Sequence, residues 1–283
     1  MNKILELFGQ SATSLNSAML KGLLKRQICP FSKTRCYKTR KSQSDISIGT
    51  CSVKYGKEDK NVIICPKRLL FQNQVFCDCI HLLTLHEPGN EFHIIPEVSV
   101  PGGSIDFFLA SVNKGKVKDF VAVEFQTMDT TGTVWPERQR LIADKRIKVN
   151  SSDTQSKKTF GMNWKMTAKT TLVQLHHKIE TLEHLGKHLV LILQDHLLTY
   201  MKEEFCFNHL NLPGKVGDSM HFHSYSLEPS GVSFSLVLKD RLSTDAAGIA
   251  TCLGLSGEAK VCLQTIISEL ERKISNQSLM TIP

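Results

Sequence analysis

Apolar residues recur along this chain at the spacing of helices in some segments and of strands in others. In Leu69–Leu85 and again in Lys165–Glu183 they return every three or four positions, which predicts a helix in each segment. Gly186 follows the second helix and is typical of a helix end. The same spacing predicts a closing helix over about Ser256–Ile274.

Extended segments lie between and after these helices. Three of them are Phe92–Val100, Ser104–Val112 and Asp119–Gln126. Glycine-containing turns at residues 101–103 and 113–116 separate them. The aliphatic run His188–Gln194 predicts a buried central strand, and the alternation in Val232–Lys239 predicts a half-buried one. The order over residues 69–195 is therefore αβββαβ, which predicts an α/β fold with a mixed sheet.

Composition adds a basic front to this picture. The 283 residues are 41% hydrophobic and 22% charged, which is ordinary for a folded protein. The net charge of +8 is concentrated in residues 1–70, which hold fourteen Lys and Arg against four acidic residues. A basic segment of this kind attracts polyanions, with nucleic acid the leading candidate and a solvated surface the alternative.

Four cysteines fall inside this basic segment and predict a metal site. They are Cys29, Cys36, Cys51 and Cys65. Turn residues flank them, and few large apolar residues lie between them, so folding of residues 1–68 should depend on a bound metal. Tetrahedral thiolates suit zinc or a mononuclear iron, and the sequence leaves both open. We expect a cytoplasmic chain with no signal peptide and no membrane span, since Leu189–Leu193 is its longest aliphatic run.

Acidic and amide side chains gather on the predicted strands. In a hairpin centred on Gly115, opposed residue numbers sum to about 230, so Asp106 lies across from Glu124. Gln126 shares the face of Glu124, because strand side chains repeat every two residues. In the preceding hairpin the sum is about 205, so Asp106 faces Ser99 and Glu97 lies diagonally nearby.

These residues match the needs of a magnesium site that hydrolyses a phosphodiester. The carboxylates of Asp106 and Glu124 and the backbone carbonyl of Phe125 offer oxygen ligands to Mg²⁺. The ion lowers the pKa of bound water and stabilises charge on the phosphate. Gln126 can orient water or phosphate, but as an amide it supplies no positive charge.

Two other groups of residues have competing interpretations. Arg138, Arg140 and the basic residues after them either contact DNA or form a solvated face. His221 and His223 share one strand face and could bind metal, although such pairs are more often structural or exposed.

The motifs together resemble the PD-(D/E)XK nuclease superfamily and, more closely, the NotI-like type II restriction endonucleases. The resemblance runs from about Cys29 to Asp195. It rests on the four-cysteine region and on Gly103–Asp106, Val123–Thr127, Trp164–Lys165 and Leu172–Lys178.

The resemblance implies a PD-(D/E)XK core over residues 69–195, followed by recognition and dimerisation elements over residues 196–283. Asp106 and Glu124 match the metal-binding acids, Gln126 matches a glutamine used in place of the usual lysine, and Glu97 matches an additional acid. The four cysteines match a structural site for iron. The implied protein is a bacterial homodimer that cuts a palindromic site in double-stranded DNA, leaves 5′-phosphate and 3′-hydroxyl ends, and has a partner methyltransferase.

Two rival interpretations remain open at this point. One is a structure-directed repair nuclease with the same core. The other is a metal-stabilised DNA-binding regulator without catalysis, in which the acidic residues are ordinary strand-end residues.

Overall fold

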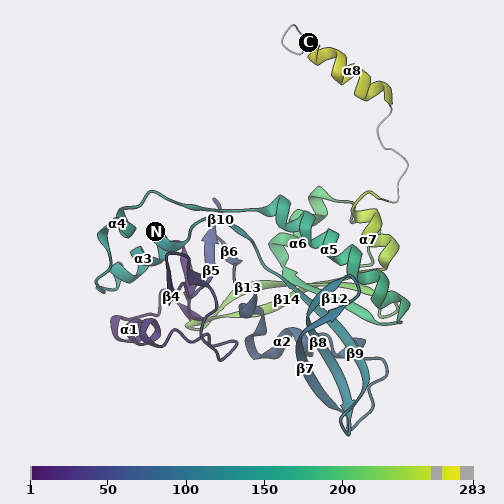
Figure 1. Cartoon of the computed structure of the whole chain (residues 1–283), viewed down its shortest axis with the longest axis horizontal. Coiled ribbons are helices and arrows are strands. Elements are labelled where there is room, and N and C mark those ends of the chain that lie inside the picture. Colours follow the sequence, from purple (N-terminus) through teal and green to yellow (C-terminus); the bar gives the residue numbers. More distant parts are fainter. Residues whose placement is uncertain (1, 256–262, 275–283) are drawn as a thin grey trace.

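The largest element of the protein is a six-stranded mixed sheet (Figure 1), in a computed structural model that describes residues 2–255 and 263–274. Its strand order is β14-β13-β12-β9-β8-β7, with β9, β12 and β13 parallel and the other neighbours antiparallel. The strands are β7 (Glu91–Val100), β8 (Gly103–Asn113), β9 (Lys116–Gln126), β12 (His188–Gln194), β13 (Met220–Ser230) and β14 (Ser233–Thr244).

Helices cover both faces of this sheet. Three of them share one face, namely α5 (Trp164–His184), α6 (Asp195–Glu204) and α7 (Ala246–Cys252). The other face carries α2 (Gln74–Cys77), flanked by the 3₁₀ segments η1 (Pro66–Asn73) and η2 (Ile80–Leu82). Strand β9 serves both layers, because Ala122 packs toward α5 while Val121 and Val123 pack toward α2. The last described helix is α8 (Leu263–Lys273), and no helix of the described residues is long and apolar enough to cross a membrane.

A second, smaller lobe holds the N-terminal residues. Its four-stranded sheet has the order β2-β1-β5-β6, and it also contains two strand pairs and three helices. These elements are β1 (Ile4–Leu7), β2 (Gln10–Ser11), α1 (Ser17–Arg26), β3 (Thr39–Arg40), β4 (Gln43–Ser47), β5 (Thr50–Tyr55), β6 (Lys60–Ile63), β10 (Thr130–Gly132), α3 (Trp135–Asp144), α4 (Ser151–Gln155) and β11 (Phe160–Met162). Residues 130–162 thus return from the core to this lobe, which the predicted boundary at residue 68 did not anticipate (Figure 1).

The predicted strands and the second helix are confirmed, but the first helix is wrong. β7, β8, β9, α5 and β12 follow one another in the predicted order, with β10, α3, α4 and β11 inserted before α5. Leu69–Leu85 is not one helix, because Gln72 and Asn73 take left-handed backbone angles (φ of 54° and 55°) that a helix does not allow. The closing helix is confirmed over Leu263–Lys273, and its predicted start at 256–262 lies outside the described residues.

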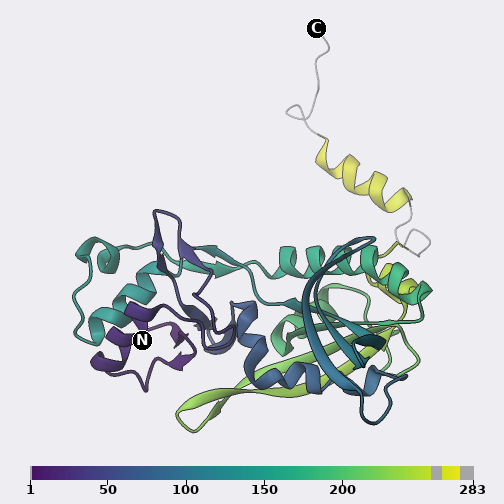
Figure 2. The same ribbon diagram turned by 60° about the horizontal axis from the view of Figure 1, so that its bottom comes forward.

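The sequence predicted a strand only at His221 and His223 of β13 and not over the rest of it, and β14 is longer than predicted. β13 is buried from Met220 to Leu227, and this stretch includes polar residues, among them His221 and Ser224. It therefore shows neither the alternation of a half-buried strand nor an aliphatic run. Its hairpin with β14 reaches from the core to the smaller lobe (Figure 2), where the Asn61 amide donates a hydrogen bond to the carbonyl of Leu227.

Candidate active site

The pairing of β8 with β9 brings Asp106 next to Glu124. Phe107 pairs with Val123, which is the register predicted from the sequence. Continued by one residue, this register sets Asp106 opposite Glu124, so that the two side chains share a face. Oδ2 of Asp106 also accepts a 2.9 Å hydrogen bond from the backbone N–H of Phe125, which fixes the carboxylate at the edge of β9.

The pairing of β7 with β8 differs from the predicted register by two residues. The sequence predicted Ser99 opposite Asp106, whereas Ser99 pairs with Ser104. The turn uses only two residues, Pro101 and Gly102, because the positive φ of Gly102 (93°) closes the chain sharply.

Glu97 lies at an irregular point of β7. Its φ is 52°, it is missing from the regular pairing between Pro96 and Val98, and its side chain is exposed. It is absent from the described residues that line the pocket around Asp106. A role for Glu97 beside the other two acids therefore stays a prediction.

Asp106, Glu124 and Gln126 line a cavity of about 220 Å³ between the edge of the sheet and helix α5. The sheet also contributes Ser104, Phe125 and Leu191, and the helix contributes Thr171, Gln174, Leu175 and Lys178. The helical residues recur every three or four positions, so they project from one face of α5 toward the acids. The cavity is thus built by β8, β9, β12 and α5 together.

An ion pair crosses this cavity. Nζ of Lys178 lies 2.7 Å from Oε1 of Glu124, and both side chains are nearly buried. The pKa of Glu124 is raised to about 7, chiefly because the carboxyl group is buried; the hydrogen bond from Lys178 opposes the rise, and the negative charge of Asp106 contributes to it. Because Glu124 is buried beside a second carboxylate, a bound cation would stabilise its ionised form.

The amide of Gln126 is turned toward the backbone. Its Nε2 donates a 2.7 Å hydrogen bond to the carbonyl of Thr127. Gln126 still lines the cavity, and its side chain brings no charge to it.

The donor set of the cavity suits Mg²⁺. No group of three or more His, Cys, Asp or Glu side chains in residues 2–255 and 263–274 is arranged to hold a metal. Mg²⁺ does not require such a cage, because it is usually held by one or two carboxylates together with water and substrate phosphate. Asp106 and Glu124, with the backbone carbonyl of Phe125, meet that smaller requirement.

The four cysteines of the smaller lobe are all buried and close enough to influence one another. Burial and the neighbouring thiols of Cys65 and Cys29 raise the pKa of Cys51 well above its ordinary value. The pKa of Cys65 is raised by burial and also by Cys36 and Cys29. Within the described chain, however, these thiols do not form a group arranged to hold a metal.

Arg138 and the paired histidines are structural in the described protein. Arg138 is buried, stacks on Trp135 with its guanidinium carbon 4.7 Å from the ring centre, and donates a 2.6 Å hydrogen bond to the carbonyl of Ile48. Arg138 therefore connects α3 to the segment between β4 and β5 inside the smaller lobe and does not face solvent. His221 and His223 are also buried, and no described metal group includes them.

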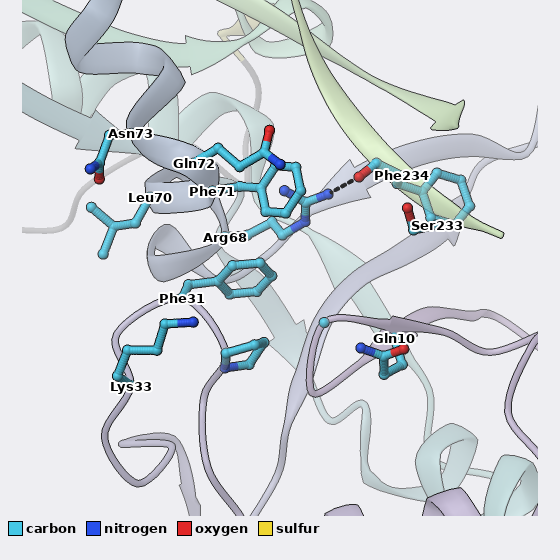
Figure 3. Close-up of a pocket in the computed structure, with 12 residues that line it drawn as sticks. Gln10, Phe31, Lys33, Arg68, Leu70, Phe71, Gln72, Asn73, Ser233 and Phe234 are labelled. Atoms are coloured by element: carbon cyan, nitrogen blue, oxygen red, sulfur yellow. Dashed lines mark hydrogen bonds between the residues drawn. The ribbon is translucent and has the colours of Figure 1, made fainter. Parts of the chain in front are cut away.

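The larger cavities lie away from the acids. One of about 520 Å³ surrounds Arg68, whose guanidinium lies 5.1 Å from the ring centre of Phe31 and 5.0 Å from that of Phe71 and donates a hydrogen bond to the carbonyl of Phe234 (Figure 3). Arg68 is already neutralised by Glu6, whose two carboxylate oxygens lie 3.0 Å from Nε. We therefore identify the candidate active site by its two converging carboxylates, Asp106 and Glu124, and not by the volume of the cavity.

Sequence reasoning missed the contribution of helix α5. Lys178 ends the segment Leu172–Lys178, which carries part of the family resemblance, but the motif predicted no role for its side chain. The sequence predicted no role for Thr171 or Gln174 either. The spacing of Thr171, Gln174 and Lys178 was a usable signal, because it sets three polar residues on the otherwise apolar face of a core helix. Only the tertiary structure shows that this face meets Glu124.

The fold and the cavity define an α/β protein with an acidic site suited to nuclease chemistry. A family model described as "Restriction endonuclease NotI" matches residues 15–211, which is 197 of the 283 residues. The chain therefore belongs to the NotI restriction endonuclease family. No curated protein matches it. Membership in this family indicates a restriction endonuclease that acts on DNA, and the matched range covers both the four cysteines and the acidic cavity.

Proposed function

We propose that the protein is a Mg²⁺-dependent type II restriction endonuclease with a PD-(D/E)XK core. It cuts double-stranded DNA at a short palindromic site and leaves 5′-phosphate and 3′-hydroxyl ends. The observation that carries this proposal is the convergence of Asp106 and Glu124 in one cavity, in a chain of the NotI family.

Asp106, Glu124 and Gln126 would each have a part in this reaction. Mg²⁺, when bound, would activate water and neutralise charge on the scissile phosphate. Asp106 and Glu124 would hold it through their carboxylates, and the hydrogen bond from Phe125 keeps Asp106 in place for that role. The free amide oxygen of Gln126 would accept a hydrogen bond from the attacking water and orient it.

A cleavage assay tests the proposal directly. The protein is incubated with phage DNA and Mg²⁺, and we expect discrete bands on a gel. Asp106→Asn and Glu124→Gln should abolish the bands while retaining DNA binding in Ca²⁺, whereas Asp144→Asn, on the exposed surface of α3, should cut normally.

The other outcomes identify the rival functions. Cutting of unrelated duplexes without a fixed pattern would show a structure-directed nuclease. Specific DNA retention with no cleavage under any divalent ion would show a regulator. Bands of normal intensity from Asp106→Asn would remove that residue from the site.

We also propose that the active form is a homodimer. A palindromic duplex presents two equivalent phosphates, and a two-fold dimer presents one acidic cavity to each strand. Analytical ultracentrifugation with DNA should give two chains for each duplex, and one chain for each duplex would contradict this. Because the chain belongs to a restriction endonuclease family, we also propose a partner methyltransferase that protects the host sequence.

For the four cysteines we propose a structural iron or zinc ion. Their burial together supports this, because a metal cation would stabilise thiolates that are otherwise unfavourable in such surroundings. Elemental analysis of purified protein should find one iron or zinc per chain, and Cys36→Ser should lose it. Protein that folds fully with neither metal would contradict the proposal.

A further inference from the structure

The acidic cavity needs a positive charge that Gln126 does not supply. Charge builds on the phosphate oxygens as a phosphodiester is hydrolysed, and a positioned cationic donor stabilises it. Gln126 is neutral, and one of its two amide N–H groups already donates to the carbonyl of Thr127. The strands of the site therefore supply carboxylates and an amide but no cation.

Lys178 is the basic residue that lines the cavity. Every other lining residue, all of them described, is acidic, polar and uncharged, or apolar. The side chain of Lys178 is only 10% exposed, and its ammonium group points to Glu124 at 2.7 Å. A lysine this buried on a core helix is rare without a specific partner.

The turn between β7 and β8 is shaped to admit this lysine. A Cβ atom at Gly102 would lie 2.1 Å from the carbonyl oxygen of His177, and one at Gly103 would lie 3.3 Å from Cε of Lys178. The hydroxyl of Thr181 donates a 3.3 Å hydrogen bond to the carbonyl of Pro101. Two adjacent glycines thus let α5 approach closely, with Lys178 directed at the acids.

We propose that Lys178 is a catalytic residue that contacts the scissile phosphate; this rests on the proposed nuclease function. Before DNA binds, its ammonium group neutralises Glu124. With a cation on Glu124, the ammonium group turns to a non-bridging phosphate oxygen. The water oxygen then bonds to phosphorus as the bond to the 3′ oxygen breaks, the water releases a proton to solvent, and the 3′ oxygen gains one. Lys178 keeps its own proton and donates a hydrogen bond throughout.

The test compares Lys178→Met with Lys169→Met, an exposed lysine of the same helix. Single-turnover cleavage by Lys178→Met should fall about 100- to 1,000-fold, the usual effect of removing one such donor. DNA affinity in Ca²⁺ and the circular dichroism spectrum should stay at wild-type values. Lys169→Met should cut at the wild-type rate, and Lys178→Arg should recover part of the loss.

Small-molecule rescue separates charge from packing. Added ethylammonium should restore cleavage to Lys178→Ala, while ethanol, which has similar size and no charge, should not. A merely structural lysine would respond to both additives or to neither.

The outcomes distinguish the two proposals. If wild-type protein cuts, Asp106→Asn does not, and Lys178→Met cuts normally, the role of Lys178 is overturned and the nuclease function stands. If wild-type protein cuts no DNA with any divalent ion, both are overturned. Equal rescue of Lys178→Ala by ethanol also overturns the role of Lys178.

Discussion

At the scale of single residues, Gly102 controls how closely helix α5 approaches the acidic cavity. Its φ of 93° is one that side-chain-bearing residues rarely adopt, and an added Cβ would meet the carbonyl oxygen of His177 at 2.1 Å. Gly115 in the next turn also has a positive φ, of 73°, but an added Cβ there meets nothing within 4 Å. Comparing Gly102 with Gly115 therefore separates two effects of an added side chain: backbone strain, which both positions share, and steric contact, which only Gly102 has.

Gly102→Ala should therefore cost more stability than Gly115→Ala. The strain alone costs about 1–2 kcal/mol at either position, and only Gly102→Ala must also move α5. Urea unfolding measures the difference, and cleavage by Gly102→Ala should drop because Lys178 moves with the helix. Equal midpoints for the two variants would contradict the close contact described here.

At the scale of elements, the buried histidines of strand β13 make the stability of the protein depend on pH. The pKa of His221 is lowered to about 4 and that of His223 to about 3; burial is the largest cause, and the nearby His188 for the first and Arg241 for the second contribute to the lowering. The folded protein thus keeps both rings neutral, whereas the unfolded chain binds protons at the ordinary pKa of 6.5.

The free energy of unfolding should consequently keep the full contribution of these two histidines above pH 6.5 and fall as the pH drops toward 4. Each histidine contributes about 1.4 kcal/mol for each pH unit over that window. Urea unfolding at pH 7 and pH 5 measures the slope, and His223→Gln should reduce it. A slope that His221→Gln and His223→Gln both leave unchanged would contradict buried, neutral rings.

Elements with a strong local pattern were predictable from the sequence, and those set by tertiary contacts were not. β12 was predicted with its observed bounds because its aliphatic run is typical of a central strand. The broken helix near Gln72 was not predictable, since the apolar spacing continues through the break. β13 carries buried polar side chains, two of which, Tyr225 and His223, have partners far away in the chain at Asp78 and Cys79, so its sequence resembles a loop.

The residues of the candidate site likewise fall into those that the sequence predicted and those that only the tertiary structure shows. Asp106 and Glu124 were predictable as neighbours, because a hairpin register fixes which residues oppose each other. The β7 register depended on a turn whose length the sequence left open. Glu97 was therefore predicted diagonal to Asp106, whereas its neighbours Pro96 and Val98 pair with Phe107 and Ile105, the two neighbours of Asp106. Lys178 came from a helix 54 residues beyond Glu124, and only packing of α5 on the sheet brings them together.

At the scale of the whole molecule, one buried ion pair joins the two lobes. Arg68 and Glu6 are each only 1% exposed, and Arg68 also bonds to the carbonyl of Phe234 at the tip of the β13–β14 hairpin. Ser52 donates a further 2.7 Å hydrogen bond to Glu6. The pair thereby connects β1, β5, η1 and β14.

Glu6→Gln should lower the free energy of unfolding by about 3–5 kcal/mol, because it leaves the buried Arg68 without a counter-charge. Glu58→Gln is the matched control, since Glu58 pairs with Lys60 on the surface and its loss should cost at most about 1 kcal/mol. Urea unfolding compares the two variants. Equal losses of stability would show that the lobes are not held together by this pair.

The central claim is that Asp106 and Glu124 hold a divalent cation beside DNA. Anomalous scattering from crystals of the protein with cognate DNA and Mn²⁺ tests it most directly. The predicted result is a manganese peak in contact with Asp106, Glu124 and the carbonyl of Phe125. A peak elsewhere, in crystals whose DNA has been cut, would contradict the account.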